Sequence, residues 1–127
     1  MNYEKGKRMK LEFLYMPTRD LSAALALYRD GLGWQEAWRE GESTVSLTLP
    51  GTEVQLMLDA SDPDAAFGPI FVVDNVHDFH TGRPSELQIS AEPEAIPGGS
   101  MATYEDQSGN TIYVLDQSED AAASETG

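Results

Sequence analysis

Residues 20–34 read DLSAALALYRDGLGW, and this stretch decides how the first part of the chain folds. Asp20 suits a helix N-cap, because its carboxylate can accept a hydrogen bond from a free N–H group of the first turn. The apolar residues that follow are spaced three and four apart, as on one face of a helix. They are Leu21, Ala24, Leu25, Tyr28 and Leu32. Gly31 or Gly33 is expected to end the helix.

Strand patterns flank this helix on both sides. Residues 11–18 come before it and are apolar on both faces, which predicts a buried strand. Another strand is expected within residues 34–40. Residues 43–49 and 53–58 each alternate between apolar and polar side chains, and the turn signal Pro50-Gly51 joins them. The expected order is therefore strand, helix, strand, strand, strand.

The second half of the chain repeats that order. A strand at residues 70–73 leads to Asp74 or Asn75, either of which can cap a short helix carrying Val76 and Phe79. The further expected strands are residues 87–89, 100–104 and 111–115, with a loop at 91–99 and a tight turn at 107–110. We therefore predict two βαβββ modules, residues 10–60 and 67–116, within one α+β domain over residues 10–116. Residues 1–9 are predicted to be a flexible N-terminus and residues 117–127 an acidic disordered tail.

Composition narrows the classes of function. The formal net charge of -14 disfavours nucleic acid and anionic membranes as partners, because such a surface repels phosphate groups. No apolar run is long enough to span a membrane, and we expect a cytoplasmic protein. The chain has no cysteine, so disulfides and thiolate chemistry are ruled out. The acidity suits either a protein adapted to high salt or an acidic protein with a charged tail.

Two motifs resemble the vicinal-oxygen-chelate superfamily, which contains glyoxalases, bleomycin-resistance proteins and extradiol dioxygenases. The first combines Asp20-Leu21, Leu27-Tyr28 and Leu32-Gly33-Trp34. The second is residues 106–112, DQSGNTI, which is similar to the family's DPDGNxI with Gln107 in place of proline. The resemblance implies that the two modules form a cupped mixed sheet with the helices outside and a pocket inside. It also implies a homodimer, because family members commonly complete their pockets by pairing modules.

Strand alternation then indicates which side chains face this pocket. The implied pocket is aromatic and apolar with a hydroxyl and amide side, which suits a small organic ligand. Some of these side chains could instead fill a solid core. The candidate ligand-binding residues are Phe13, Tyr15, Thr44, Ser46, Gln55, Met57, Gly68 and Tyr113.

The resemblance also locates four positions at which metal-using relatives carry His or Glu ligands. The first and third are Phe13 and Gly68, seven residues before Asp20 and Asn75, and the others are Gln55 and Tyr113. These side chains are a poor set for a divalent ion. We therefore expect no metal and no other cofactor. A second possible metal site would hold zinc with His77 and His80, together with Asp74 and Asp78. We favour instead the interpretation that these residues lie on a solvated outer helix.

Four functions remain open. The favoured one is a metal-independent, bleomycin-resistance-like protein that binds a small organic molecule. An alternative is a metal-free lyase or isomerase in which Tyr15 or Tyr113 donates a proton and Glu12 or Glu53 acts as the base. A metal-dependent glyoxalase or dioxygenase type with atypical ligands, or a regulatory module that binds a partner, would also use this fold. The sequence leaves open whether the protein catalyses a reaction.

Overall fold

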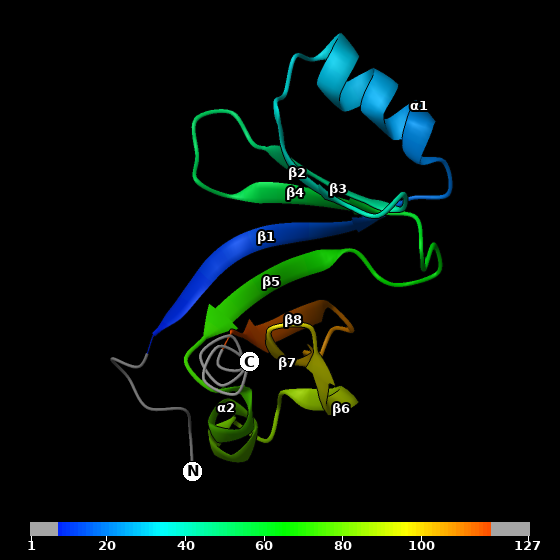
Figure 1. Ribbon diagram of the computed structural model, residues 1–127. Coiled ribbons are helices and arrows are strands. Elements are labelled where there is room, and N and C mark those ends of the chain that lie inside the picture. Colours follow the sequence, from blue (N-terminus) through cyan, green and yellow to red (C-terminus); the bar gives the residue numbers. More distant parts are fainter. Residues whose placement is uncertain (1–7, 118–127) are drawn as a thin grey trace. The chain divides into compact units, whose positions relative to one another are not determined.

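A computed structural model describes residues 8–117 of the chain (Figure 1). The described residues form two compact units, one of residues 12–69 and one of residues 70–117 with 8–11. Each unit contains the greater part of one predicted βαβββ module. The expected flexible N-terminus and acidic tail lie outside the described residues, apart from residues 8, 9 and 117. None of the helices in the described part of the chain combines the length and apolar character needed to cross a bilayer.

The first module has one helical segment and four strands. Its strands are ordered β2-β3-β4-β1, with β1 parallel to β4 and the other neighbours antiparallel. The parallel pair requires a crossover, which the helix and the β2–β3 hairpin supply. The elements are β1 (Met9–Pro17), α1 (Leu21–Leu25), the π-helix η1 (Ala26–Gly31), β2 (Glu36–Glu40), β3 (Thr44–Thr48) and β4 (Gln55–Asp59).

The second module repeats this arrangement. Its strands are ordered β5-β8-β7-β6, and the first and last strands along the chain are again the parallel pair. The elements are β5 (Gly68–Val73), α2 (Val76–Gly82), β6 (Gln88–Ile96), β7 (Gly99–Glu105) and β8 (Thr111–Asp116). The predicted α+β class and the paired βαβββ modules are therefore confirmed.

Both helices begin as the sequence predicts. The side chain of Asp20 accepts a hydrogen bond from Ala23 N at 3.0 Å, and that of Asn75 accepts one from Asp78 N at 2.9 Å. The first helix does not continue as an α-helix, however, because its second half widens into η1. The wider turn changes the direction of later side chains. As a result Leu32, predicted on the buried stripe, is 56% exposed, and Trp34 packs against the core in its place.

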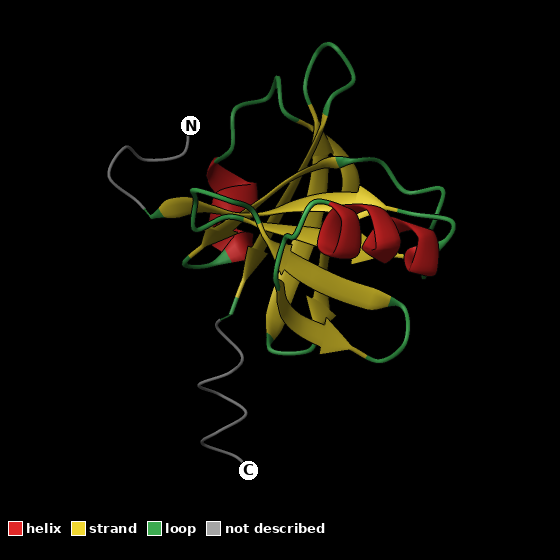
Figure 2. Cartoon of the chain, turned by 90° about the horizontal axis from the view of Figure 1, so that it is seen from above, coloured by secondary structure: helices red, strands yellow, loops and turns green. Residues whose placement is uncertain are grey.

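Each helix covers one face of its own module (Figure 2). In the first module Leu25 packs against a fully buried cluster from β3 and β4. In the second, Val76 and Phe79 of α2 pack against β7 and β8. The buried strand residues are Val45, Leu47, Leu56 and Leu58 in the first core, and Val73, Ala102, Tyr104 and Val114 in the second. In both cores the buried residues of one strand stand two apart, because every second residue of a strand points to the same face.

One predicted loop is wrong. Residues 91–99 were expected to form a loop, whereas β6 continues to Ile96 and the turn is confined to Pro97 and Gly98. Pro93 suggested a break in the strand. Strand β6 lies at the end of the sheet order and has register shifts on both sides of Ala91, so the proline does not interrupt a central ladder.

Candidate functional site

Six predicted ligand-binding residues share one face of the first module. Phe13 lies opposite Gln55 and Tyr15 opposite Met57 in the β1–β4 register. Met57 also pairs with Ser46 in β3, so alternation turns these side chains away from the helix. We call this surface the inner face. Its predicted members are Phe13, Tyr15, Thr44, Ser46, Gln55 and Met57.

Polar groups at one end of the inner face converge on Asp59, the last residue of β4. The Tyr15 hydroxyl donates to Asp59 Oδ2 at 2.5 Å, and the Thr44 hydroxyl donates to Oδ1 at 3.0 Å. The backbone N–H and the hydroxyl of Ser61 also donate to Oδ1, at 3.0 and 2.7 Å. Asp59 is 8% exposed, and its carboxylate joins three strands and the following loop.

These hydrogen bonds determine the charge state of Asp59. Burial by itself raises the pKa of the carboxyl, but the donors from Tyr15, Ser61 and Thr44 outweigh it and hold the pKa below its usual range. Asp59 is therefore an ionised acceptor at neutral pH. Because its oxygens are already occupied and its basicity is low, it is poorly suited to abstract a proton.

Aromatic side chains dominate the other part of the inner face. The ring of Phe13 meets that of Trp38 edge to face, with centroids 6.1 Å apart and planes at 85°. Their strands are separated by β3 and β4, so the contact reaches over the middle of the sheet. Beneath it the Ser46 hydroxyl, fully buried, donates to Gln55 Oε1 at 2.7 Å. The inner face thus offers two rings with an amide and a hydroxyl between them.

Sequence reasoning missed two members of this face. Asp59 falls one residue beyond the strand predicted at residues 53–58, and Trp38 lies within the strand expected in residues 34–40, for which no side was assigned. Alternation supplied the signal for Asp59, because it follows Gln55 and Met57 at intervals of two. The side of Trp38 is set by its pairing with Ser46 after an irregularity in β2, which the sequence does not reveal.

The other two predicted residues lie in strands of the second parallel pair. Tyr113 of β8 is 7% exposed and pairs with Ile70 of β5, whereas Gly68 stands two residues earlier in the same strand. Ile70 therefore holds the register position that Phe13 holds in the first module. Ile70 lies five residues before its helix cap Asn75, whereas Phe13 lies seven residues before Asp20. The strand continues for one residue fewer after this position in the second module, and the connection to the cap is also one residue shorter.

The four metal-ligand positions do not provide a suitable donor set. Phe13, Gly68 and Ile70 carry no coordinating atom, and the amide oxygen of Gln55 already accepts from Ser46. Tyr113 adds a phenol. Within residues 8–117, no three His, Cys, Asp or Glu side chains gather in a geometry that could hold an ion. Divalent metals in this role need imidazole or carboxylate ligands, so these positions do not fit one.

The two histidines do not form a joint site. His80 Nδ1 lies 2.7 Å from the Tyr104 hydroxyl, and Nε2 lies 3.3 Å from a Glu92 carboxylate oxygen. The His80 side chain is 19% exposed, so the expected solvated position on the outer helix is wrong for this residue. Tyr104 is fully buried, and burial raises its pKa to about 12. The cluster joins α2 to its sheet.

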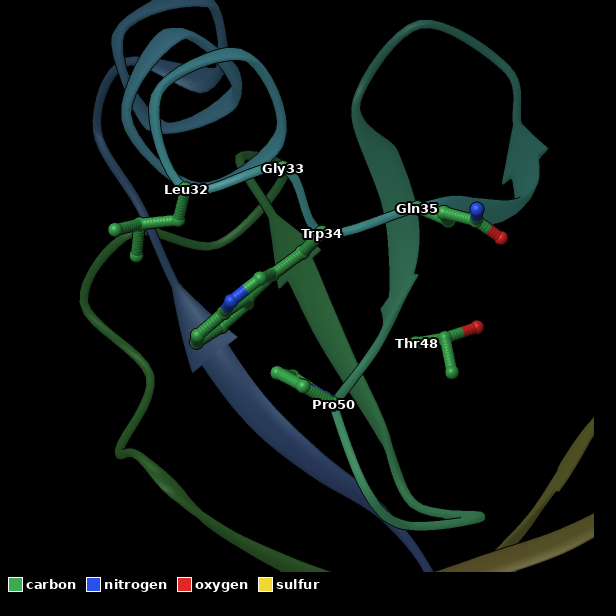
Figure 3. Close-up of a pocket in the computed structure, with 6 residues that line it drawn as sticks. All are labelled: Leu32, Gly33, Trp34, Gln35, Thr48 and Pro50. Carbon is green, nitrogen blue, oxygen red and sulfur yellow. The ribbon is translucent and has the colours of Figure 1, made fainter.

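A pocket of about 270 Å³ lies where η1 ends and β3 leads into the next turn, and Thr48, the register partner of Gln55, is among its lining residues (Figure 3). Leu32, Trp34 and Pro50 provide its apolar side, and the picture shows these three side chains approaching one another. Trp34 also stacks on Tyr28, with centroids 5.3 Å apart. None of the predicted site residues lines this pocket.

The architecture of the two modules and the inner face define the class of protein. The chain belongs to the Glyoxalase/Bleomycin resistance protein/Dioxygenase superfamily, whose family model matches residues 10–114. No curated protein sequence matches it.

Solved structures agree on the fold. A Legionella pneumophila protein described as an NAD-dependent benzaldehyde dehydrogenase aligns with a TM-score of 0.65 at 14% identity, covering 83% of this chain and 97% of that one. A hypothetical protein from Bacillus halodurans C-125 has the same TM-score and identity, with 87% and 95% covered. Methylmalonyl-CoA epimerase from Streptomyces coelicolor aligns at 0.63 and 15%, with 85% and 96% covered. At these identities the likeness establishes the fold alone.

Proposed function

We propose that this protein binds a small organic molecule on the inner face without a metal ion. The observation that carries the proposal is the register pair of Phe13 and Gln55. It puts a phenyl ring and an amide at positions where metal-using relatives are expected to carry side chains that coordinate the metal. A ring and an amide recognise a ligand by apolar contact and hydrogen bonding. They lack the Lewis-acid chemistry of a bound metal.

The remainder of the inner face suits a ligand with an apolar or aromatic part. Phe13 and Trp38 can each present a ring to it, and Met57 is a flexible apolar neighbour. The Gln55 amide and Tyr15 hydroxyl supply polar contacts on the same face. Because the Phe13 and Trp38 rings touch each other, a ligand that stacks on either ring must open this contact.

Binding by these rings is tested with a thermal-shift screen of small aromatic alcohols, amines and acids, run in the presence of a chelator. A ligand that binds the folded chain raises its melting temperature, and the rise grows with the logarithm of ligand concentration relative to Kd. Phe13→Ala and Trp38→Ala should each weaken a hit by about tenfold, since one lost ring contact costs about 1–2 kcal/mol. Phe67→Ala is the control, because Phe67 is an aromatic residue that is 52% exposed and is not one of the residues that define the inner face. Equal loss in all three variants would contradict the proposal.

A second candidate is a metal-free acid–base enzyme, which the Tyr15–Asp59 hydrogen bond favours. The carboxylate beside Tyr15 is Asp59, and not the Glu12 or Glu53 proposed from the sequence. In this alternative the Tyr15 hydroxyl would donate a proton to the substrate while Asp59 held it in place. Binding remains the favoured function, because the lowered pKa of Asp59 makes it a weak base. Turnover of a screening hit that is abolished by Tyr15→Phe, with binding retained, would reverse this order.

A further inference from the structure

The inner face carries negative charge where β2, β3 and β4 are in register. Thr44 of β3 pairs with Glu40 on one side and with Asp59 on the other. Side chains directly opposite each other in neighbouring antiparallel strands point to the same face, so Glu40 joins the inner face beside Asp59. We call Glu40, Thr44 and Asp59 the carboxylate row. Its two acidic residues are two strand spacings apart, about 10 Å between backbones.

The two carboxylates of this row differ in their surroundings. Asp59 is buried, and three hydroxyls and a backbone N–H already donate to its oxygens. It therefore acts as a fixed negative charge. Glu40 is exposed, and none of the basic side chains within residues 8–117 pairs with it. Its carboxylate can rotate toward a ligand and accept hydrogen bonds from it.

No positive charge from the same unit balances the carboxylate row. Residues 12–69 contain three basic side chains, and each forms an ion pair with a carboxylate outside this row. They are Arg19, Arg29 and Arg39. Arg39 lies opposite Val45, a residue of the helix-facing core, and so belongs to the other face of β2. An anion on this part of the inner face would meet two negative charges and no positive one.

Aromatic side chains lie next to the carboxylate row. The adjacent row of the sheet begins with Trp38 in β2 and ends with Tyr15 in β1. Phe13 contacts Trp38, and all three aromatic residues are half-buried. The face of an aromatic ring is electron-rich and attracts a cation, most strongly for tryptophan. Rings and carboxylates on this face therefore favour the same kind of charged group.

We infer that the ligand of the inner face carries a protonated amine attached to its apolar part. The inference rests on the proposed binding at this face and adds the charge of the ligand. An ammonium group can contact an aromatic ring, donate hydrogen bonds to Glu40 and lie in the field of Asp59. The net charge of -14 also favours the approach of a cation. A neutral ligand would use the rings alone.

The thermal-shift screen tests this inference when its compounds are arranged in sets that share one apolar skeleton. One such set is 2-phenylethylamine, 2-phenylethanol and 3-phenylpropionate. At about pH 7 and low salt, titration calorimetry should show the amine binding at least about tenfold more tightly than the alcohol, and the acid more weakly than either. Added salt should reduce the advantage of the amine, because it screens the charges.

A pair of variants separates the inner face from the overall charge of the protein. Glu40→Gln should weaken binding of the amine by about threefold to fivefold and leave binding of the alcohol unchanged. Glu42→Gln is the matched control, because it removes the same charge from an exposed residue in the turn between β2 and β3. It should leave both affinities unchanged. Melting temperatures without ligand show whether each variant is folded.

The outcomes distinguish this inference from the binding proposal on which it rests. Hits confined to alcohols or acids, with binding lost in Phe13→Ala, would support binding at the inner face and overturn the inference. Equal weakening by Glu40→Gln and Glu42→Gln would also overturn it, since overall charge would then explain the preference. A screen without any hit would overturn the binding proposal itself, and the inference with it.

Discussion

Phe13 stands directly opposite Gln55 in the parallel register of β1 and β4. This pair joins the fold to the proposed function. The first and last strands of the first module bring a phenyl ring and an amide together on the inner face. The hydrogen bond from Ser46 to Gln55 and the ring contact from Phe13 to Trp38 then fix both side chains.

The Tyr15–Asp59 hydrogen bond should contribute measurably to stability. Tyr15→Phe removes a donor to a buried carboxylate, and we expect it to lower the free energy of unfolding by about 1–3 kcal/mol. Chemical denaturation provides the measurement. Tyr28→Phe is the control, because the Tyr28 hydroxyl makes no hydrogen bond to the described part of the chain, and its effect should be much smaller. Comparable losses in the two variants would show that the bond does not stabilise the fold.

Asp59 should also make stability depend on acid pH. Its pKa in the folded chain is lowered from the ordinary 3.8, so its stabilisation is complete above that value. It is lost as the pH falls through the lower folded pKa, because the unfolded chain binds the proton more readily. Asp59→Asn should remove this part of the acid dependence of the melting temperature. An unchanged pH profile in the variant would contradict the assignment.

Tyr104 should titrate well above the ordinary range of a tyrosine. Burial raises its pKa to about 12 from an ordinary 10.0, while Arg83 lowers it and Glu92 raises it to smaller extents. The stabilisation from the protonated hydroxyl is therefore present below pH 10 and is lost as the pH rises toward 12. In an ultraviolet titration, a tyrosine should ionise near pH 12, and Tyr104→Phe should remove that step. If the variant keeps the step near pH 12, another tyrosine is responsible for it.

Gly99 should not tolerate a side chain. A Cβ at this position would lie 2.0 Å from the backbone oxygen of Asp116, which β8 holds in place. We expect Gly99→Ala to destabilise the protein by about 3 kcal/mol or more, as overpacking against backbone does. In Gly31→Ala the new atom would lie 3.2 Å from Ala26 O, and the cost should be under about 1 kcal/mol. Denaturant unfolding of the two variants gives the comparison, and a tolerated Gly99→Ala would mean that β7 can move away from β8.

The sequence predicted the modules well because their signals are local. The caps Asp20 and Asn75 and the alternation in β3 and β4 depend on neighbouring residues alone, and the structure confirms them. Leu32 was predicted on the wrong face because the π-helical turn depends on the tertiary structure, which a pattern of α-helical spacing does not predict. Asp59 and Trp38 escaped notice because their roles arise from hydrogen bonds and ring contacts between strands, at residues distant in the chain.

The most direct test of metal-independent ligand binding is elemental analysis of the untagged protein, combined with the thermal-shift screen in chelator. Metal-independent binding predicts a metal content far below one ion per chain, and an organic ligand that raises the melting temperature equally with and without chelator. It also predicts that Phe13→Ala loses this stabilisation. One zinc, nickel, manganese or iron ion per chain, with ligand binding that disappears when the metal is removed, would contradict it.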